Sequence, residues 1–249
     1  MKNIQTSKIL IRNLENLTTD DLFEIKLKLS MPDSTIQIRN SRFYLPNYPV
    51  DLIQHEIVAK RNYWEYEQLS EIDKHLKDNA VIIDVGANIG NHSLYWAMER
   101  HAKKIYAFEP IESTYEILER NIQLNNLEDV IQPYNLGLSD EETFAKIKDY
   151  NISNIGGTEL NKAKWGQIKL VPLDSLSLKR KIDVIKIDVE ESEADVLIGA
   201  TKTIQKNKPL IIIESFSQNK AMIDVILKEL KYKQIEQLTD TDFIYKYIG

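Results

Sequence analysis

Four acidic residues stand at points where short apolar runs predict that β-strands end. Asp84, Glu109, Asp188 and Glu214 occupy these places. In an open parallel sheet, ligands bind outside the carboxyl ends of the strands, so carboxylates at those ends can meet in one crevice. Such groups can accept hydrogen bonds, remove a proton or hold a cation. The sequence therefore predicts a site at the carboxyl edge of a sheet.

A glycine-containing turn directly after the first strand has the features of a cofactor site. Gly86 and Gly90 flank Asn88, and helical character resumes at Asn91. Glycine lets a ligand approach the backbone closely, and the first N–H groups of a helix attract anionic groups. Glu109 follows the turn by about 20 residues, where an acid can accept hydrogen bonds from ribose hydroxyls. These residues indicate a site for a ribose-containing cofactor; the alternative is a plain turn beside a solvated glutamate.

The elements that must position these residues alternate along the chain. Apolar strand-like runs are followed by amphipathic helices, a pattern that predicts a parallel sheet covered on both faces. The end of the chain alternates as an antiparallel pair would. We therefore expect an α/β fold with a Rossmann-like, seven-stranded, mostly parallel sheet and helices on both faces. The expected strands are 81–84, 104–109, 130–135, 184–188, 209–214, 233–238 and 242–247, and the expected helices are 91–100, 113–125, 192–204 and 220–230.

Two regions make up the predicted domain organisation. Residues 58–249 should form the main domain, entered through a helix from about 58 to 76, and residues 1–57 a small N-terminal α/β extension. In the extension we expect a helix from about Thr19 and a β-hairpin joined at Asn40–Ser41. The hairpin would either cover the site or build a homodimer.

A segment from 139 to 178 interrupts the rhythm of strands and helices. We expect it to form an insertion above the carboxyl edge of the sheet. Within it, Asn154, Gly156 and Gly157 are candidate acceptor contacts, because short polar residues there would overhang the site. A simple turn is the alternative interpretation.

At these motifs the chain resembles the FkbM family of S-adenosylmethionine (SAM) dependent methyltransferases. The matching segments are 81–95, 106–110, 120–126 and 185–200. The resemblance implies a class I methyltransferase fold, SAM as cofactor, and an acceptor hydroxyl on a small molecule such as a sugar, a nucleotide-sugar or a bacterial glycan. It also implies that the stretch after the third strand borders the adenine. The candidate cofactor-binding residues are Asp84, Gly86, Asn88, Gly90, Asn91, Glu109, Asn135 and Gly137.

One position departs from the family pattern. The family usually has glycine after the Asp-Val-Glu triplet, where this chain has Glu191. The resemblance therefore does not fix the shape of the turn into the next helix or acceptor contacts there such as Glu190.

The acceptor end of the predicted site contains groups that could activate an alcohol. Asp188 and Glu214 should lie side by side and either accept the hydroxyl proton or hold Mg²⁺ or Mn²⁺, which favour oxygen ligands. Alternatively, Asp188 caps the next helix and Glu214 faces solvent. His92 is a second candidate base because it titrates near neutrality, although a helix-capping role is the more common one at such a position.

Composition narrows the partners. The 249 residues carry a formal net charge of −6, which disfavours DNA and RNA, whose binding rests on lysine and arginine contacts to phosphate. There is no cysteine, so thiolate zinc sites and cysteine nucleophiles are excluded. No apolar run is long enough for a membrane span, and the N-terminus lacks the apolar core of a secretory signal, so we expect a cytoplasmic protein.

Three rival functions remain on sequence grounds. An NAD(P)-dependent oxidoreductase would share the glycine turn and acid, but Asn88 stands where the dinucleotide fingerprint has its second glycine, and no Tyr-x-x-x-Lys pair occurs. A nucleic-acid amino-methylating enzyme would show an Asp/Asn-Pro-Pro-aromatic motif, where this chain has Asp188-Val-Glu190. A noncatalytic protein with the same fold is the third.

Overall fold

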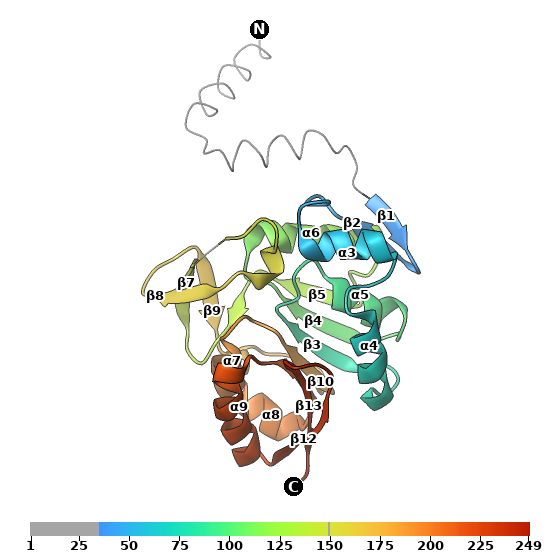
Figure 1. Ribbon diagram of the computed structural model, residues 1–249. Helices are drawn as coiled ribbons and strands as arrows, with labels where there is room; N and C mark the ends of the chain where they lie inside the picture. Colours follow the sequence, from blue (N-terminus) through green and yellow to red (C-terminus); the bar gives the residue numbers. More distant parts are fainter. Residues whose placement is uncertain (1–34, 149) are drawn as a thin grey trace.

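The large sheet of the protein has seven strands in the order β12-β13-β11-β10-β3-β4-β5 (Figure 1). A computed structural model describes residues 35–148 and 150–249. Neighbouring strands from β11 to β5 are parallel, and β13 runs antiparallel to both β11 and β12. The expected seven-stranded, mostly parallel sheet is confirmed. Its strands are β3 Val81–Val85, β4 Lys104–Phe108, β5 Ile131–Tyr134, β10 Val184–Ile187, β11 Leu210–Glu214, β12 Tyr232–Gln237 and β13 Asp242–Tyr247.

Helices cover both faces of this sheet because its strands are apolar on both sides. Ile82 packs into a core with the helices α5 and α6, while Val81 and Ile83 pack into a second core with α7, α8 and α9. Alternate residues of one strand thus enter different cores, as the pleat of a strand requires. The helices are α5 Asn91–Met98, α6 Glu112–Leu124, α7 Glu193–Gly199, α8 Thr201–Asn207 and α9 Ser217–Glu229.

The helix predicted for 192–204 is divided into α7 and α8. Ala200 separates them with non-helical dihedrals. A Cβ atom on Gly199 would lie 1.9 Å from the carbonyl oxygen of Ser139, so the chain approaches a neighbouring loop closely at this point. This tertiary contact explains why local periodicity did not show the division.

A β-hairpin precedes the main sheet at the expected place. Its strands are β1 Thr35–Ile38 and β2 Ser41–Tyr44, joined through Arg39 and Asn40. Ile38, Phe43 and Leu45 share one core with α5 and α6. The helix expected from Thr19 lies outside the described residues, and the boundary at 57 and the homodimer stay predictions.

The single helix expected from 58 to 76 is wrong, because the structure has two helices and a short 3₁₀ turn there. They are α3 Leu52–Lys60, α4 Tyr66–Ile72 and η1 Asp73–His75. Arg61 and Glu65, on either side of the break, both have left-handed backbones, with φ of 49° and 60°. The break brings Trp64 and Glu65 to the cavity described below.

The segment from 139 to 178 contributes most of a second, four-stranded sheet, β6-β9-β7-β8 (Figure 1). Its strands are β6 Gly137–Leu138, β7 Thr143–Ile147, β8 Leu160–Ala163 and β9 Ile168–Val171, with 3₁₀ turns η2 Ile155–Gly157 and η3 Leu173–Ser175. The segment between β7 and β8 borders the cavity. Among the described residues, no helix is both long and apolar enough to cross a membrane.

Candidate functional site

A cavity of about 490 Å³ opens at the carboxyl ends of β3, β4, β10 and β11. This is the edge at which the strand-terminal acids were expected to meet. Two thirds of the candidate site residues line it. They are Gly86, Asn88, Glu109, Gly137, Asn154, Gly156, Gly157, Asp188, Glu190 and Glu214.

The glycine turn between β3 and α5 forms one wall of the cavity. Gly86 has φ of 76°, and a Cβ atom there would lie 1.8 Å from the carbonyl oxygen of Asp188. Asn88 also adopts a left-handed backbone, with φ of 50°. Only glycine fits the first of these positions, because the turns after β3 and β10 touch there. The tight turn therefore exposes its backbone to whatever occupies the cavity.

Glu109, directly after β4, is fixed by this turn. One of its carboxylate oxygens accepts the N–H of Asn88 and the other accepts the N–H of Ile111, each at 2.9 Å. The residue is 5% exposed, and burial raises the pKa of its carboxyl to about 7. Each oxygen keeps a further lone pair, so the carboxylate can still accept a hydrogen bond from a ligand.

Three candidate cofactor contacts hold the site together from outside the cavity. Asp84 accepts a hydrogen bond from Ser93 Oγ at 2.6 Å and lies 3.5 Å from Lys186 Nζ. The side-chain amide of Asn135 donates to the carbonyl of Glu109 at 3.0 Å. A Cβ atom on Gly90 would lie 2.7 Å from Leu118. These residues support the cofactor wall and do not line it.

Thr114 is a cavity residue that sequence reasoning missed. It belongs to α6, is 3% exposed, and its hydroxyl oxygen has no hydrogen-bond partner. A buried polar atom without a partner is costly, which suggests that a ligand satisfies it. A signal was present in the sequence, because Thr114 interrupts the apolar stripe that continues with Ile117 and Leu118.

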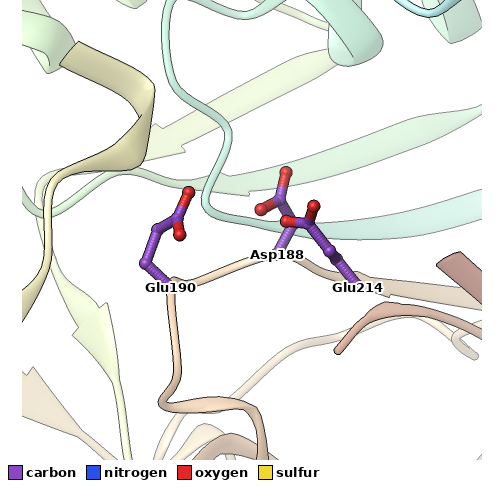
Figure 2. A group of neighbouring side chains, drawn as sticks. All are labelled: Asp188, Glu190 and Glu214. Atoms are coloured by element: carbon purple, nitrogen blue, oxygen red, sulfur yellow. The ribbon is translucent and has the colours of Figure 1, made fainter. Parts of the chain in front are cut away.

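Three carboxylates converge at the other end of the cavity (Figure 2). Asp188, Glu190 and Glu214 each offer an oxygen, and these oxygens all lie within 4.8 Å of one another. Lys186 Nζ, which is buried, lies 2.9 Å from an Asp188 oxygen and donates to the carbonyl of Gly86 at 3.1 Å. The lysine thus joins the carboxylate group to the glycine turn.

The three carboxyl groups have different proton affinities. Burial alone would raise the pKa of Asp188, but the charge of Lys186 holds it below its ordinary value. Burial and the adjacent Asp188 raise the pKa of Glu214 well above its ordinary value. Burial, with the charge of Asp188, raises the pKa of Glu190 to about 7. Near neutral pH, Asp188 is therefore ionised and Glu214 carries a proton.

The turn after β10 has a left-handed backbone at the position where the family usually has glycine. Glu190 and Glu191 have φ of 51° and 72°, a left-handed geometry in which glycine would be free of strain. Glu191 accepts a side-chain hydrogen bond from Gln218, and its carbonyl accepts one from Asn219 at 3.2 Å. These contacts tie the strained turn to the start of α9.

Two further candidates, Asn91 and His92, do not line the cavity. The side chain of Asn91 bonds to both the N–H and the carbonyl of Trp64, each at 3.0 Å. His92 Nε2 lies 3.2 Å from a carboxylate oxygen of Glu65. The structure therefore places both side chains against the segment between α3 and α4.

A roof over the glycine turn is built from the start of α3 and the η2 segment. The N–H of Ile155 donates to Asp51 at 3.0 Å, and the N–H of Leu52 donates to the carbonyl of Ser153 at 2.9 Å. A Cβ atom on Gly156 would lie 2.8 Å from both Asn88 and Ile53. The expected overhang of Asn154, Gly156 and Gly157 is thus present, at the cavity wall.

Comparison with known proteins agrees with this geometry. The model of the methyltransferase FkbM domain matches residues 84–239. A crystal structure of a methyltransferase FkbM from Methylobacillus flagellatus superposes with a TM-score of 0.52 at 20% identity, covering 69% of this chain and 44% of that one. The shared architecture is the class I methyltransferase fold.

Two curated relatives match this chain over different shares of their own length. The AMB antimetabolite synthetase AmbE of Pseudomonas aeruginosa is 30% identical over an alignment of 182 positions, which covers 56% of this chain and 8% of AmbE. The hexuronic acid methyltransferase AglP of Haloferax volcanii is 26% identical over 173 residues, 68% of this chain and 70% of AglP. The chain therefore spans a small part of the first and most of the second.

Proposed function

Because the chain belongs to the FkbM methyltransferase family, we propose that it transfers a methyl group from SAM to a hydroxyl group of a small molecule, namely a sugar, a nucleotide-sugar or a bacterial glycan. The family model spans residues 84–239, which include both ends of the cavity. The name of AglP, a hexuronic acid methyltransferase, supports a sugar acceptor. The homology favours this function over the oxidoreductase and the noncatalytic alternatives.

The observation that carries the proposal is the buried Glu109 beside the glycine turn in one cavity. Glu109 would accept hydrogen bonds from the ribose, and the turn from Gly86 to Gly90, of which Gly86 and Asn88 line the cavity, would hold the methionyl end. Thr114 has a buried hydroxyl without a partner in the same cavity, and Gly137 also lines it. The residues present therefore fit SAM, which when bound supplies a methyl group on a positively charged sulfur.

At the opposite end, the carboxylates would orient the acceptor and take its proton. An alcohol is a weak nucleophile until its proton is removed, and a base within hydrogen-bond reach serves this purpose. Asp188 is ionised and fixed by Lys186, whereas Glu214 is protonated and can donate a hydrogen bond to the acceptor oxygen or to Asp188. This division of roles supports Asp188 as the residue that faces the hydroxyl proton.

A divalent cation is the second candidate for activating the hydroxyl. The cluster of Asp188, Glu190 and Glu214 has the oxygen ligands that Mg²⁺ or Mn²⁺ prefers. However, the Lys186 ammonium already lies 2.9 Å from Asp188, and a second cation there would be repelled. The proton-accepting version is therefore favoured, and it predicts that methyl transfer survives treatment with EDTA.

The proposed function is tested with SAM carrying a labelled methyl group and a panel of neutral, acidic and nucleotide-linked sugars. Mass spectrometry of the products should show a sugar heavier by one labelled methyl group and S-adenosylhomocysteine in equal amount. The proposal would be contradicted if SAM lost its labelled methyl group and no sugar gained it. Methylation of a nucleic acid or a protein in a control reaction would also contradict it. The expected cytoplasmic location stays a prediction.

A further inference from the structure

The break between α3 and α4 places an aromatic residue and an acid in the wall of the cavity. Trp64 and Glu65 both line it, together with Asp188 and Glu214. Glu65 has a left-handed backbone with φ of 60°, which is unfavourable for any residue except glycine and, to a lesser degree, asparagine. Strained backbone is concentrated at functional sites, where surrounding contacts maintain it.

Asn91 supplies the contacts that maintain this strained segment. Its side chain is 5% exposed and uses both its oxygen and its nitrogen on the peptide groups of Trp64. Because this one side chain accepts a hydrogen bond from the N–H of Trp64 and donates one to its carbonyl, it fixes the backbone of Trp64 in two directions. Asn91 therefore belongs to the support of Trp64 and Glu65.

His92 lies beside the carboxylate of the same segment. Its Nε2 atom lies 3.2 Å from Glu65, and the two side chains are 14% and 26% exposed. The histidine lies at a small second cavity of about 20 Å³, which Glu65, Asp188 and Glu214 also line. Glu65 thus stands between His92 on one side and the large cavity on the other.

The charge of the large cavity restricts what can enter it. Among the described residues that line it, six are acidic, of which Glu214 carries a proton near neutral pH, and Lys162 is the one cation. Lys162 is already paired, because it contacts Asp140 and lies 2.7 Å from Asp195. The buried Lys186 does not line the cavity and is already paired with Asp188 and Asp84. A phosphate or carboxylate group beside Glu65 and Asp188 would therefore meet like charge with no unpaired cation among the described residues of this wall. Neutral hydroxyl groups can instead donate hydrogen bonds to these carboxylates.

We infer that Trp64 and Glu65 form the acceptor subsite, which takes an uncharged sugar through its hydroxyl groups, and that Asn91 and His92 position it. The inference rests on the proposed function and narrows its acceptor to uncharged sugars, in contrast to the hexuronic acid in the name of AglP. The aromatic side chain offers an apolar surface to the C–H groups of a sugar ring, and Glu65 accepts a hydrogen bond from a hydroxyl beside the one that is methylated. An acidic sugar or the diphosphate of a nucleotide-sugar is excluded from this end.

Two glycosides that differ only at C6 provide a direct test. Methyl glucoside and methyl glucuronide are titrated by NMR into the full-length protein saturated with S-adenosylhomocysteine. We expect the wild type to bind the glucoside at least tenfold more tightly than the glucuronide. Glu65→Gln should weaken glucoside binding and reduce this ratio to less than a third. The matched control is Glu67→Gln, because Glu67 is an exposed acid on α4 outside the cavity, and it should keep the wild-type ratio.

Each other outcome of this titration counts against a defined part of the account. Equal or tighter binding of the glucuronide, an unchanged ratio in Glu65→Gln, or no binding of either glycoside would overturn the subsite while leaving the cofactor site intact. Failure to bind S-adenosylhomocysteine would overturn the proposed function, and the subsite with it.

The positioning role is tested separately on Asn91 and His92. Asn91→Ala should weaken glucoside binding at least fivefold and keep SAM affinity within twofold of wild type. If Asn91→Ala does not fold, Asn91→Asp replaces it. Asn91→Asp keeps the acceptor for the Trp64 N–H and should weaken glucoside binding by a smaller factor. His92→Gln should raise the acceptor KM several-fold and leave kcat within threefold. Loss of SAM affinity in the Asn91 variants would assign Asn91 to the cofactor, and a collapse of kcat in His92→Gln would make His92 the base.

Discussion

At the cofactor end of the cavity the binding groups come largely from two short segments, the turn after β3 and the residues after β4, whereas at the acceptor end they are side chains from three separate parts of the chain. Gly86 and Glu109 are fixed by backbone contacts between adjacent strands. Asp188 and Glu214 likewise lie at the ends of adjacent strands, β10 and β11, whereas Glu65 reaches them only through tertiary packing. The contrast suggests that the cofactor end is a property of the fold, and that the acceptor end is the part that can vary between relatives.

The largest expected effect is a loss of kcat at Asp188, which should affect the acceptor end of the cavity and leave the cofactor end unchanged. Asp188→Asn should lower kcat by about 10²- to 10⁴-fold, the usual loss when a general base is removed, with SAM affinity little changed. Methyl-transfer kinetics and calorimetric SAM titration measure the two quantities. Glu214→Gln is the matched control, because glutamine mimics the neutral, protonated Glu214 and should cost less than about tenfold. A larger loss in Glu214→Gln than in Asp188→Asn would reverse the assigned roles.

The second effect lies at the cofactor end. Glu109→Ala should weaken SAM binding by roughly 10²-fold, because it removes hydrogen bonds to a charged group worth about 1.5 to 3 kcal/mol each. Glu112→Ala serves as the control, since Glu112 is an exposed acid on α6 that does not line the cavity. If both variants bind SAM like the wild type, Glu109 does not hold the ribose.

A smaller effect concerns pH and should appear at the cofactor end. The ionised form of Glu109 accepts the ribose hydroxyls, and burial raises its pKa to about 7. SAM affinity should therefore rise with pH between 6 and 8 and weaken roughly five- to tenfold at the acidic end of that window. Calorimetric titrations at several pH values measure it, and the Glu109→Gln variant should lack the dependence. Affinity that falls as pH rises would mean that the neutral acid binds SAM.

The smallest expected effect is at Glu191, at the acceptor end, where one substitution should raise stability and lower activity. Glu191→Gly should raise the free energy of unfolding by about 0.5 to 1 kcal/mol, because glycine relieves the left-handed strain at some cost in chain entropy. Methyl transfer should nevertheless fall about two- to tenfold, because the turn loses its side-chain tie to Gln218. Urea unfolding and kinetics measure the two changes.

The control for this prediction is His101→Gly. His101 is exposed and also left-handed, with φ of 51°, but does not line the cavity. It should gain similar stability without any loss of activity. Equal activity in both glycine variants would show that the tie between Glu191 and α9 does not position the turn.

The same contrast explains what could be predicted from the sequence. The strands of the large sheet and the turn from Gly86 to Gly90 were predictable because apolar runs and glycine spacing are local signals. The break before Trp64 was not, because it depends on hydrogen bonds from Asn91, 27 residues later in the chain. Asn91 and His92 were expected near cofactor and acceptor from their place after the turn, whereas their side chains lie against Trp64 and Glu65.

The central claim is that the cavity binds SAM through the turn after β3 and Glu109. Calorimetric titration of the wild-type protein with SAM, and with NADH as the rival cofactor, tests it most directly. The account predicts micromolar binding of SAM at a ratio of about one per chain and no heat of binding with NADH. Binding of NADH without binding of SAM would contradict it.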